Sequence, residues 1–409
     1  MKKKKLFYGW RIVGAGACLQ IMQSAMLHQA FGAYVAVLTA ERGWSKTALS
    51  GAAALQSAES ALIGPILGWI IDRFGPQGMV RMGIFILGAG FMLLSQIESL
   101  VGFYGAFFVI AVGASMSGFF PLNVAVIQWF DKFRARALSG FSLGLSVGGI
   151  LLPVVAYCIA TFGWRPTAFG SGVIFIVIGY PLARVVRRRP EDHGLTVDGL
   201  IKVSAADSSD DEPAPRRDFS AREAIRTRAF WMVSLGHACA MMAVYVVSVH
   251  AITHMMDLGY TLAEASFAIM LMTVGQGAGV LIGGAIGDRF EKRYLAAFCN
   301  LMHAAGLLML TYALNNAMIV GFALLHGVAW GLRGPLMQAI RADYFGRRAI
   351  GLILGLSSMV VVSGHIIGPM VAGVFADWTG NYRVGFTVVA GLVCLGSLFF
   401  VMAKSPHER

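Results

Sequence analysis

One arginine, Arg333, lies near the middle of a long apolar stretch that runs from residue 317 to residue 342. Because a charge within an apolar helix is costly, such a residue normally faces a wet cavity or a partner. Residues at helical spacing around it form one stripe, which consists of His326, Trp330, Arg333 and Met337. A guanidinium on this stripe presents a planar fork to a carboxylate. The pattern favours an anion site; a structural charge paired with a carboxylate or with helix-end carbonyls is the alternative.

A second charge, Glu59, lies near the middle of the apolar stretch 46–71. A lone carboxylate in a low-dielectric environment favours its protonated form, and a residue that carries a coupled proton needs that property. The sequence therefore suggests Glu59 as a proton-coupling residue. A neutral or ion-paired structural glutamate is the alternative.

A short loop motif occurs twice. Asp72-Arg73 follows one apolar stretch and Asp288-Arg289 follows another, separated by about half of the 409-residue chain. Further pairs share this offset, namely Pro121 with Pro335, Pro153 with Pro369, and Trp164-Arg165 with Tyr382-Arg383. Two parallel apolar halves are typical of a transporter built from repeats related by an axis along the membrane normal.

The elements that position these residues are predicted to be membrane helices. Hydrophobic residues make up 57% of the chain and charged residues 13%, against roughly a quarter charged in soluble domains. A spanning helix needs about 20 apolar residues. Charged and Gly/Pro/Asn clusters separate twelve such stretches, at 10–38, 46–71, 79–96, 100–130, 137–161, 165–186, 229–256, 263–287, 294–314, 317–342, 349–376 and 384–403. We expect an all-α membrane protein with two six-helix bundles.

The net charge of +12 follows membrane topology rather than nucleic-acid binding. With both termini inside, the basic residues on predicted outer segments are limited to Arg42, Lys46, Arg165 and Arg383, out of 33 Lys and Arg. This asymmetry is the positive-inside rule, and it indicates contact with an anionic lipid leaflet. We therefore expect cytoplasmic termini, membrane lipid as a partner and no nucleic acid.

The polar stretch 187–228 contains proline, serine and mixed charge without apolar periodicity. It predicts a cytoplasmic linker between an N-terminal bundle, 1–186, and a C-terminal bundle, 229–409. The other loops are short and leave no room for a soluble catalytic domain, and the sequence has no Gly-x4-Gly-Lys-Ser/Thr loop for nucleotide. We expect neither an enzyme nor a bound cofactor.

No metal site is expected. The five cysteines fall within predicted helices without ligand-like spacing. His250, His254 and Asp257 have a spacing that could hold zinc, but no fourth ligand is evident. An interfacial or gating cluster is therefore favoured.

The repeated motifs and helix count resemble the major facilitator superfamily across the whole chain. The resemblance rests on Gly68-x3-Asp72-Arg73-x-Gly75, its copy at Asp288, and the glycine-rich helix that ends at Pro153. Further motifs resemble the oxalate:formate antiporter and monocarboxylate transporter branch: Tyr8-Gly9-Trp10, Trp129-Phe130 with Arg134 and Arg136, Gly163-Trp164-Arg165, His250 with Asp257-Leu258-Gly259, Gly334-Pro335, and Tyr344-Phe345-Gly346.

The resemblance implies roles for these residues. Helix 10 lines the central cavity in this superfamily, so Arg333, Trp330 and His326 are expected to form the C-terminal half of a substrate site. Other polar residues of that site are Gln276, Asn123 and Gln23. Helices 2 and 11 adjoin, which makes His365 a possible partner of Glu59 in proton coupling. The family's loop pairs act as latches, which assigns Asp72, Arg73, Asp288 and Arg289 to gating.

One departure qualifies the resemblance. The branch commonly has a carboxylate-binding arginine on helix 8, eight residues before the loop aspartate, and that position is Val280 here.

Glycines crowd helix 5 and helix 8, as in closely packed membrane helices. They would either pack these helices or give smooth surfaces on which the halves rock.

The leading hypothesis is a secondary active transporter, functional as a monomer, in the cytoplasmic (inner) membrane. It would carry a small organic anion, with a carboxylate favoured, by proton-coupled transport or by exchange. A drug or metabolite efflux antiporter is the alternative within transport, and the missing helix 8 arginine favours it. A membrane sensor that keeps the fold without transport is a third hypothesis.

Overall fold

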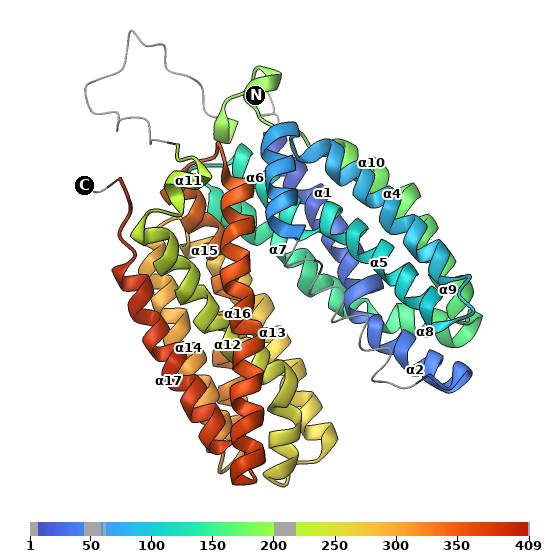
Figure 1. Ribbon diagram of the computed structural model, residues 1–409, viewed down its shortest axis with the longest axis vertical. Helices are drawn as coiled ribbons and strands as arrows, with labels where there is room; N and C mark the ends of the chain where they lie inside the picture. Colours follow the sequence, from blue (N-terminus) through green and yellow to red (C-terminus); the bar gives the residue numbers. More distant parts are fainter. Residues whose placement is uncertain (1–6, 45–58, 60–62, 200–217, 408–409) are drawn as a thin grey trace, which may run out of the picture. The chain divides into compact units, whose positions relative to one another are not determined.

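The computed structural model describes residues 7–44, 59, 63–199 and 218–407. Within these residues the chain consists of helices and the segments that join them, without β-strands. Contacts divide the chain into two compact units, Met1–Pro215 (unit 1) and Arg216–Arg409 (unit 2). Figure 1 shows the helices of each unit running roughly along one another. The predicted all-α architecture is confirmed.

Eleven helices in the described residues are long and apolar enough to cross a membrane. Those of unit 1 are Tyr8–Thr39, Pro76–Leu94, Leu100–Trp129, Arg134–Phe162 and Trp164–Val185. Those of unit 2 are Arg228–Asp257, Phe267–Ile286, Lys292–Thr311, Asn316–Phe345, Ile350–Thr379 and Arg383–Met402. They coincide with the predicted spans to within a few residues at each end. The remaining prediction, 46–71, lies mostly outside the described residues, although residues 63–74 are helical.

Several membrane helices of unit 1 are interrupted. The first consists of α1 (Tyr8–Gln23), a π-helical turn η1 (Ser24–Gln29) and α2 (Phe31–Arg42). The fourth consists of α5 (Leu100–Ser117) and α6 (Phe119–Trp129), which meet at Gly118. The other elements are α4 (Pro76–Leu94), α7 (Arg134–Ile150), α8 (Leu152–Phe162), α9 (Trp164–Ile174), η2 (Phe175–Gly179) and α10 (Tyr180–Val185). In a membrane such interruptions are tolerated where protein or cavity water satisfies the freed backbone groups.

The helices of unit 2 are longer and continuous. They are α12 (Arg228–Asp257), α13 (Leu262–Ile286), α14 (Lys292–Thr311), α15 (Asn316–Phe345), α16 (Ile350–Thr379) and α17 (Arg383–Met402), preceded by the single turn α11 (Ala221–Ala224). Side-chain oxygens of Thr227, Thr261 and Asn315 accept a backbone N–H at the starts of α12, α13 and α15. Such caps fix where a helix begins.

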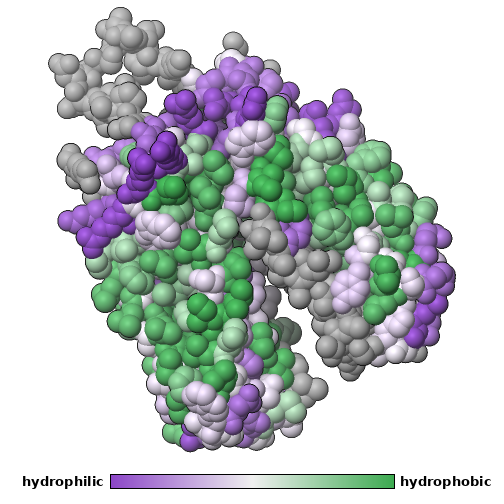
Figure 2. Space-filling model, viewed as in Figure 1, coloured by the Kyte–Doolittle hydropathy of each residue, from purple (hydrophilic) through white to green (hydrophobic). Residues whose placement is uncertain are grey.

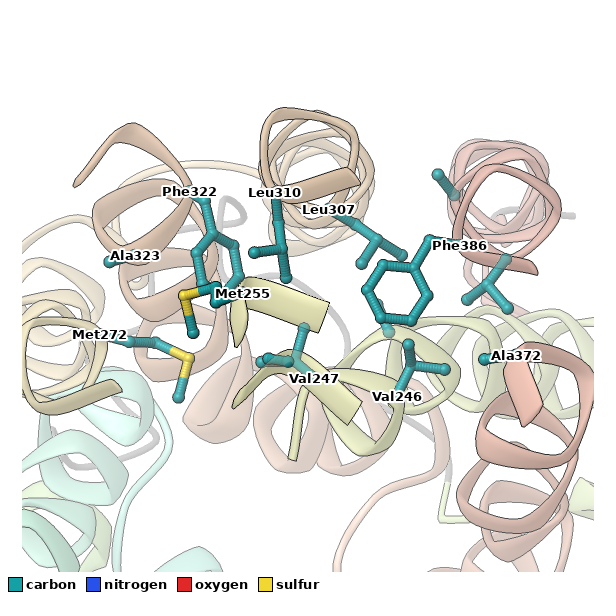
Figure 3. Packing of buried hydrophobic residues seen from close by; sticks show 14 of the residues in the cluster. Val246, Val247, Met255, Met272, Leu307, Leu310, Phe322, Ala323, Ala372 and Phe386 are labelled. Atoms are coloured by element: carbon teal, nitrogen blue, oxygen red, sulfur yellow. The ribbon is translucent and has the colours of Figure 1, made fainter. Parts of the chain in front are cut away.

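The core of unit 2 lies where α12, α14, α15 and α17 meet. In Figure 3, Phe322 of α15, Leu310 of α14 and Phe386 of α17 lie along one side of α12 at Val246 and Val247. All five side chains are at most 2% exposed. Because lipid is as apolar as these side chains, close packing rather than burial from water holds such helices together.

The outward helix faces are apolar, as a membrane requires. On α13 the exposed side chains Phe267, Val274 and Leu281, which are 59%, 62% and 60% exposed, recur every seven residues. This spacing places them on one stripe. Figure 2 shows hydrophobic residues along the sides of the helices and hydrophilic residues gathered at helix ends. The surface fits a lipid environment.

The glycines of helices 5 and 8 pack within their own units. A Cβ on Gly148 of α7 would lie 2.5 Å from Ser24, in η1 of the same unit. A Cβ on Gly279 of α13 would lie 2.9 Å from the backbone of Leu332 on α15. Of the two predicted roles for these glycines, the structure supports close helix packing at these two positions.

Both ends of the predicted linker 187–228 are folded onto a unit. Asp198 accepts hydrogen bonds from the backbone N–H groups of Asp131, Lys132 and Phe133 in unit 1, at N···O distances of 2.8–3.4 Å. Asp218 accepts one from the Arg347 N–H in unit 2, at 2.8 Å. The described part of the linker is therefore docked at its two ends, and residues 200–217 lie outside the described residues.

Candidate functional site

Arg333 lies inside α15 and is 1% exposed. Its Nε and Nη1 atoms are buried and have no hydrogen-bond partner among the described residues. Pro335 follows two positions later within the same helix, and because proline has no N–H, the carbonyl four residues earlier, at Gly331, loses its helical donor. The site therefore combines a buried cation with a break in the helical hydrogen-bond pattern.

No buried acid neutralises this charge within the described part of unit 2. The buried charged or titratable side chains there are His254, Cys299, His303, His326, Arg333 and Arg341, none of which is a carboxylate. The carboxylates all belong to helix ends or loops, at Asp218, Glu223, Asp257, Glu264, Asp288, Glu291, Asp343 and Asp377. An isolated buried charge is strongly unfavourable, so this interior is suited to an anion that enters from outside the unit.

His326 faces α14. Its Nδ1 lies 3.2 Å from Nδ1 of His303, and both imidazoles are fully buried. The ring of Phe322 packs 5.8 Å away. His326, which is predicted to belong to the substrate site together with Arg333, is paired with His303 inside unit 2.

The other stripe residues also face the interior of unit 2. Trp330 is half-buried and packs against Met241 and Val244 of α12 and Val361 of α16. Met337 is fully buried in a cluster that includes Cys299 of α14. The predicted stripe is thus one side of α15, and α12, α14 and α16 supply its contacts.

Gln276 lies on α13, directly against α15. A Cβ on Gly331 would lie 2.8 Å from the Gln276 carbonyl carbon and 2.8 Å from the Val280 nitrogen. The side chain of Gln276 is half-buried. Two glycines of α15, Gly327 and Gly331, allow this approach, since a Cβ on either would meet the α13 backbone.

A buried network around Arg341 was missed by the sequence analysis. Arg341 lies one residue from the end of the predicted span 317–342 and was given no role there, but it is 2% exposed inside α15. Its guanidinium donates to Ser357 Oγ at 2.9 Å and to the Met337 carbonyl at 2.8 Å, and it lies 3.1 Å from His237 Nδ1. Ser357 in turn contacts Ser234 at 2.7 Å. This network joins α12, α15 and α16. Ser357 and His237 lie 16 and 104 positions from Arg341 along the chain, so the periodicity of one helix could not reveal it.

The predicted polar contacts of the N-terminal half are buried between helices of unit 1. Gln23 donates to Ser117 Oγ at 3.1 Å, which links α1 to α5. Asn123 donates to the Phe119 carbonyl within its own helix at 2.8 Å, and its Oδ1 is buried without a partner in the described part of the chain. Gln20 has a buried Nε2 in the same condition. These amides could accept or donate hydrogen bonds to a polar ligand.

The two proposed proton-coupling residues belong to different units. Glu59 is 5% exposed and accepts a hydrogen bond from Ser115 Oγ at 2.8 Å. His365 of α16 stacks on Tyr245 of α12, with ring centroids 4.0 Å apart and an interplanar angle of 15°. Within its own unit, Glu59 is therefore hydrogen-bonded to Ser115, and His365 is stacked on Tyr245.

The gating candidates lie at helix ends. Arg73 lies over the rings of Trp69 and Phe74, at 5.4 and 5.5 Å. Arg188, from the segment after α10, donates to the carbonyls of Asp72 and Arg73 at 3.1 and 3.2 Å, which suits a cation at a helix C-terminus. Arg188 is thus a further residue at this loop that the sequence analysis did not identify.

In unit 2, Asp288 and Arg289 follow α13, and the adjacent end of α14 is tied to α15. Lys292 Nζ lies 2.9 Å from Asp343 Oδ2. Asp343 belongs to the last turn of α15. An ion pair of this kind can form in one conformation and open in another.

The histidines near the C-terminal end of α12 contact backbone carbonyls. His250 Nε2 lies 3.2 Å from the Pro369 carbonyl, and His254 Nε2 lies 3.2 Å from that of Leu310. The described residues contain no group of three or more His, Cys, Asp and Glu arranged to hold a metal ion. These contacts join α12 to α16 and α14, and the interfacial or gating role of the cluster stays a prediction.

Comparison with known proteins identifies the family. The model of the Major Facilitator Superfamily matches residues 14–272 and 233–409. The MFS transporter asaE of Aspergillus flavus is 25% identical over 369 residues, which cover 88% of this chain and 77% of that protein. Monocarboxylate transporter 13 of Bos taurus is 20% identical over 406 residues, covering 98% and 90%.

A solved structure agrees with the fold. The human organic anion transporter MFSD10 (TETRAN) superposes with a TM-score of 0.71 at 13% identity, covering 96% of this chain and 99% of that one. At this identity the likeness concerns the fold alone. Together with the matched family model and the helix pattern of both units, it confirms the predicted resemblance: the chain belongs to the major facilitator superfamily.

Proposed function

We propose that this chain is a secondary active transporter that carries a small organic anion, with a carboxylate as the favoured class, across the cytoplasmic membrane. One observation carries the proposal: Arg333 is a buried cation without a hydrogen-bond partner or buried counter-charge in the described part of unit 2. A carboxylate that binds there would supply the missing charge and accept two parallel N–H bonds. The name of one similar protein, a monocarboxylate transporter, supports the same class.

Binding to purified protein tests the proposal, with L-lactate and oxalate as probes. Arg333→Gln should weaken binding by about 2–3 kcal/mol, or roughly 30- to 150-fold, because a hydrogen bond to a charged group is lost. Arg333→Lys should not restore wild-type affinity, since an ammonium lacks the planar fork. Lys404→Gln, which removes an exposed charge near the C-terminus, is the control and should bind as wild type does.

Protein stability separates a binding role from a structural one. If Arg333 awaits a ligand, Arg333→Met should leave the thermal stability of the ligand-free protein unchanged or raise it, because an uncompensated buried charge is removed. If Arg333 is a paired structural charge, the same change should destabilise by about 3–5 kcal/mol. Equal anion affinity in Arg333→Gln and wild type would remove the basis of the proposal.

The proposed transport cycle uses proton coupling or exchange, with Glu59 and His365 as proton-coupling residues and the two Asp-Arg loops as gates. Uptake of labelled lactate and oxalate into proteoliposomes, with and without a pH gradient, measures the coupling. Glu59→Gln should remove the pH dependence of uptake while exchange continues. An unchanged pH profile in that variant would make Glu59 structural.

A drug or metabolite efflux antiporter is the second candidate. Val280 occupies the position of the helix 8 arginine of the monocarboxylate branch, and it is 4% exposed. The anion site would then rely on Arg333 alone. Equal transport of a neutral or cationic compound by wild type and Arg333→Gln would favour efflux.

A further inference from the structure

Two buried histidines form a pair in unit 2 that the proposed cycle does not yet use. His303 of α14 and His326 of α15 approach to 3.2 Å between their Nδ1 atoms, with ring centroids 4.4 Å apart. The helices come together closely at this point, since a Cβ on Gly306 would lie 3.3 Å from the His326 Cβ. The pair is therefore held by the packing of α14 on α15.

The pair has a defined place for one extra proton. A hydrogen bond between two Nδ1 atoms requires that one ring donates and the other accepts. In the neutral pair the donating ring then carries no proton on Nε2. The Nε2 atoms of both rings are buried and have no hydrogen-bond partner among the described residues. A proton added to Nε2 of the donating ring would turn the shared bond into a charge-assisted one.

Arg333 is the cation that opposes this protonation. It follows His326 by seven residues, about 10 Å along the helix axis, and a helical side chain leans towards the N-terminus, here towards His326. Both imidazoles are fully buried, so an added charge on either ring is already costly. Two like charges at such a separation in a low-dielectric interior repel each other. A vacant Arg333 thus favours the neutral pair.

The remaining surroundings of the pair offer no compensating negative charge. Other titratable groups inside these helices include Cys299 on α14, Arg341 on α15, His237 on α12 and His365 on α16, none of which is a carboxyl group. On α13 the one titratable residue is Glu264, in the exposed first turn. On α17, Arg383 lies at the first residue and Cys394 is exposed. An anion bound at Arg333 would therefore be the negative charge closest to the pair.

We propose that the His303–His326 pair takes up one proton when an anion binds at Arg333, so that anion and proton bind cooperatively. The anion neutralises the guanidinium, so of the two contributions that keep the pair neutral, burial and repulsion from Arg333, it removes the second. Linkage is reciprocal, so a protonated pair in turn binds the anion more tightly. This proposal rests on the anion site proposed above, and it places a coupling proton in unit 2, apart from Glu59.

Proton uptake by the purified wild-type protein tests the proposal directly. L-lactate or oxalate is added in weakly buffered solution between pH 5 and 8, and a pH-indicator dye records the protons taken up per anion bound. These probes are already ionised in that range, so uptake belongs to the protein. We expect up to one proton per anion, and an affinity that falls up to tenfold per pH unit where the pair loses its proton. Binding without uptake at every pH would overturn the proposal.

Three variants locate the proton. His303→Gln and His326→Gln should each bind the anion with no proton uptake and with little pH dependence. His250→Gln is the matched control, because that histidine contacts the Pro369 carbonyl near the C-terminal end of α12, and it should keep the uptake. If Glu59→Gln abolishes the uptake while both pair variants retain it, the proton belongs to Glu59 and this proposal is wrong.

The outcomes separate this inference from the function on which it rests. Anion binding that depends on Arg333 but occurs without proton uptake leaves the anion site intact and refutes the linked pair. Absence of lactate and oxalate binding, or binding that survives Arg333→Gln unchanged, counts against the anion site and the pair together. The wild-type proton count does not depend on whether a variant folds.

Discussion

Replacing Gly331 by alanine should destabilise unit 2, whereas the same change at Gly334 should not. Both residues belong to α15 and lie three positions apart. A Cβ at Gly331 would meet the Gln276 carbonyl oxygen and would lie 2.8 Å from the Val280 backbone nitrogen, whereas a Cβ at Gly334 has no such neighbour within 4 Å. Because backbone atoms cannot rotate away, α13 and α15 would have to move apart.

The difference between the two variants isolates this contact. Glycine to alanine favours a helix by about 1 kcal/mol at either position, so that contribution cancels. Overpacking costs about 1–3 kcal/mol, which for a unit of this size corresponds to roughly 2–12 °C in the midpoint of thermal unfolding. The gain at Gly334 should leave that variant as stable as wild type or more stable.

A thiol-reactive dye provides the assay, because Cys299 is fully buried in α14 and becomes accessible only when unit 2 unfolds. The midpoints of wild type, Gly331→Ala and Gly334→Ala are compared in one detergent. If Gly331→Ala unfolds at the same temperature as Gly334→Ala or at a higher one, α13 and α15 do not pack as closely as described. The placement of Gln276 against α15 would then also be wrong.

Three further predictions concern the linker and the gates. Asp198→Ala should speed hydrogen exchange of the amides at Asp131, Lys132 and Phe133 about 5- to 30-fold, since about 1–2 kcal/mol of capping is lost. Asp192→Ala changes an exposed residue of the same segment and should leave the exchange of these amides unchanged. Equal protection in both variants would contradict the docking of Asp198 on unit 1. Asp72→Asn should reduce transport far more than anion affinity, because a gate biases a conformational equilibrium; a large loss of affinity with normal alternation would exclude that role. The cysteine of Ser208→Cys should not be labelled by an impermeant thiol reagent added outside intact cells, since the linker is predicted to be cytoplasmic. Labelling above the level of the parent protein would show that the predicted topology is wrong.

The sequence by itself determined the membrane spans and the duplicated organisation. Hydropathy depends only on which residues occur in a window, so the span from residue 317 to residue 342 could be placed within a few residues of α15. The cost of a charge in an apolar helix likewise identified Arg333 and Glu59 without any tertiary information. The structure finds both side chains buried, at 1% and 5% exposure.

The tertiary structure decided which residues those side chains meet. His303 and His326 are 23 positions apart on different helices, and Arg341 reaches Ser357 and His237 on two others. Arg341 was missed because it lies one residue from the predicted end of its helix, where boundaries are uncertain, while α15 continues to Phe345. The periodicity of one helix defines a stripe but not the neighbour that it faces. Which neighbour a stripe faces depends on how each helix is rotated and how closely the helices approach. In unit 2 the glycines of α13 and α15 allow the close approach of these two helices.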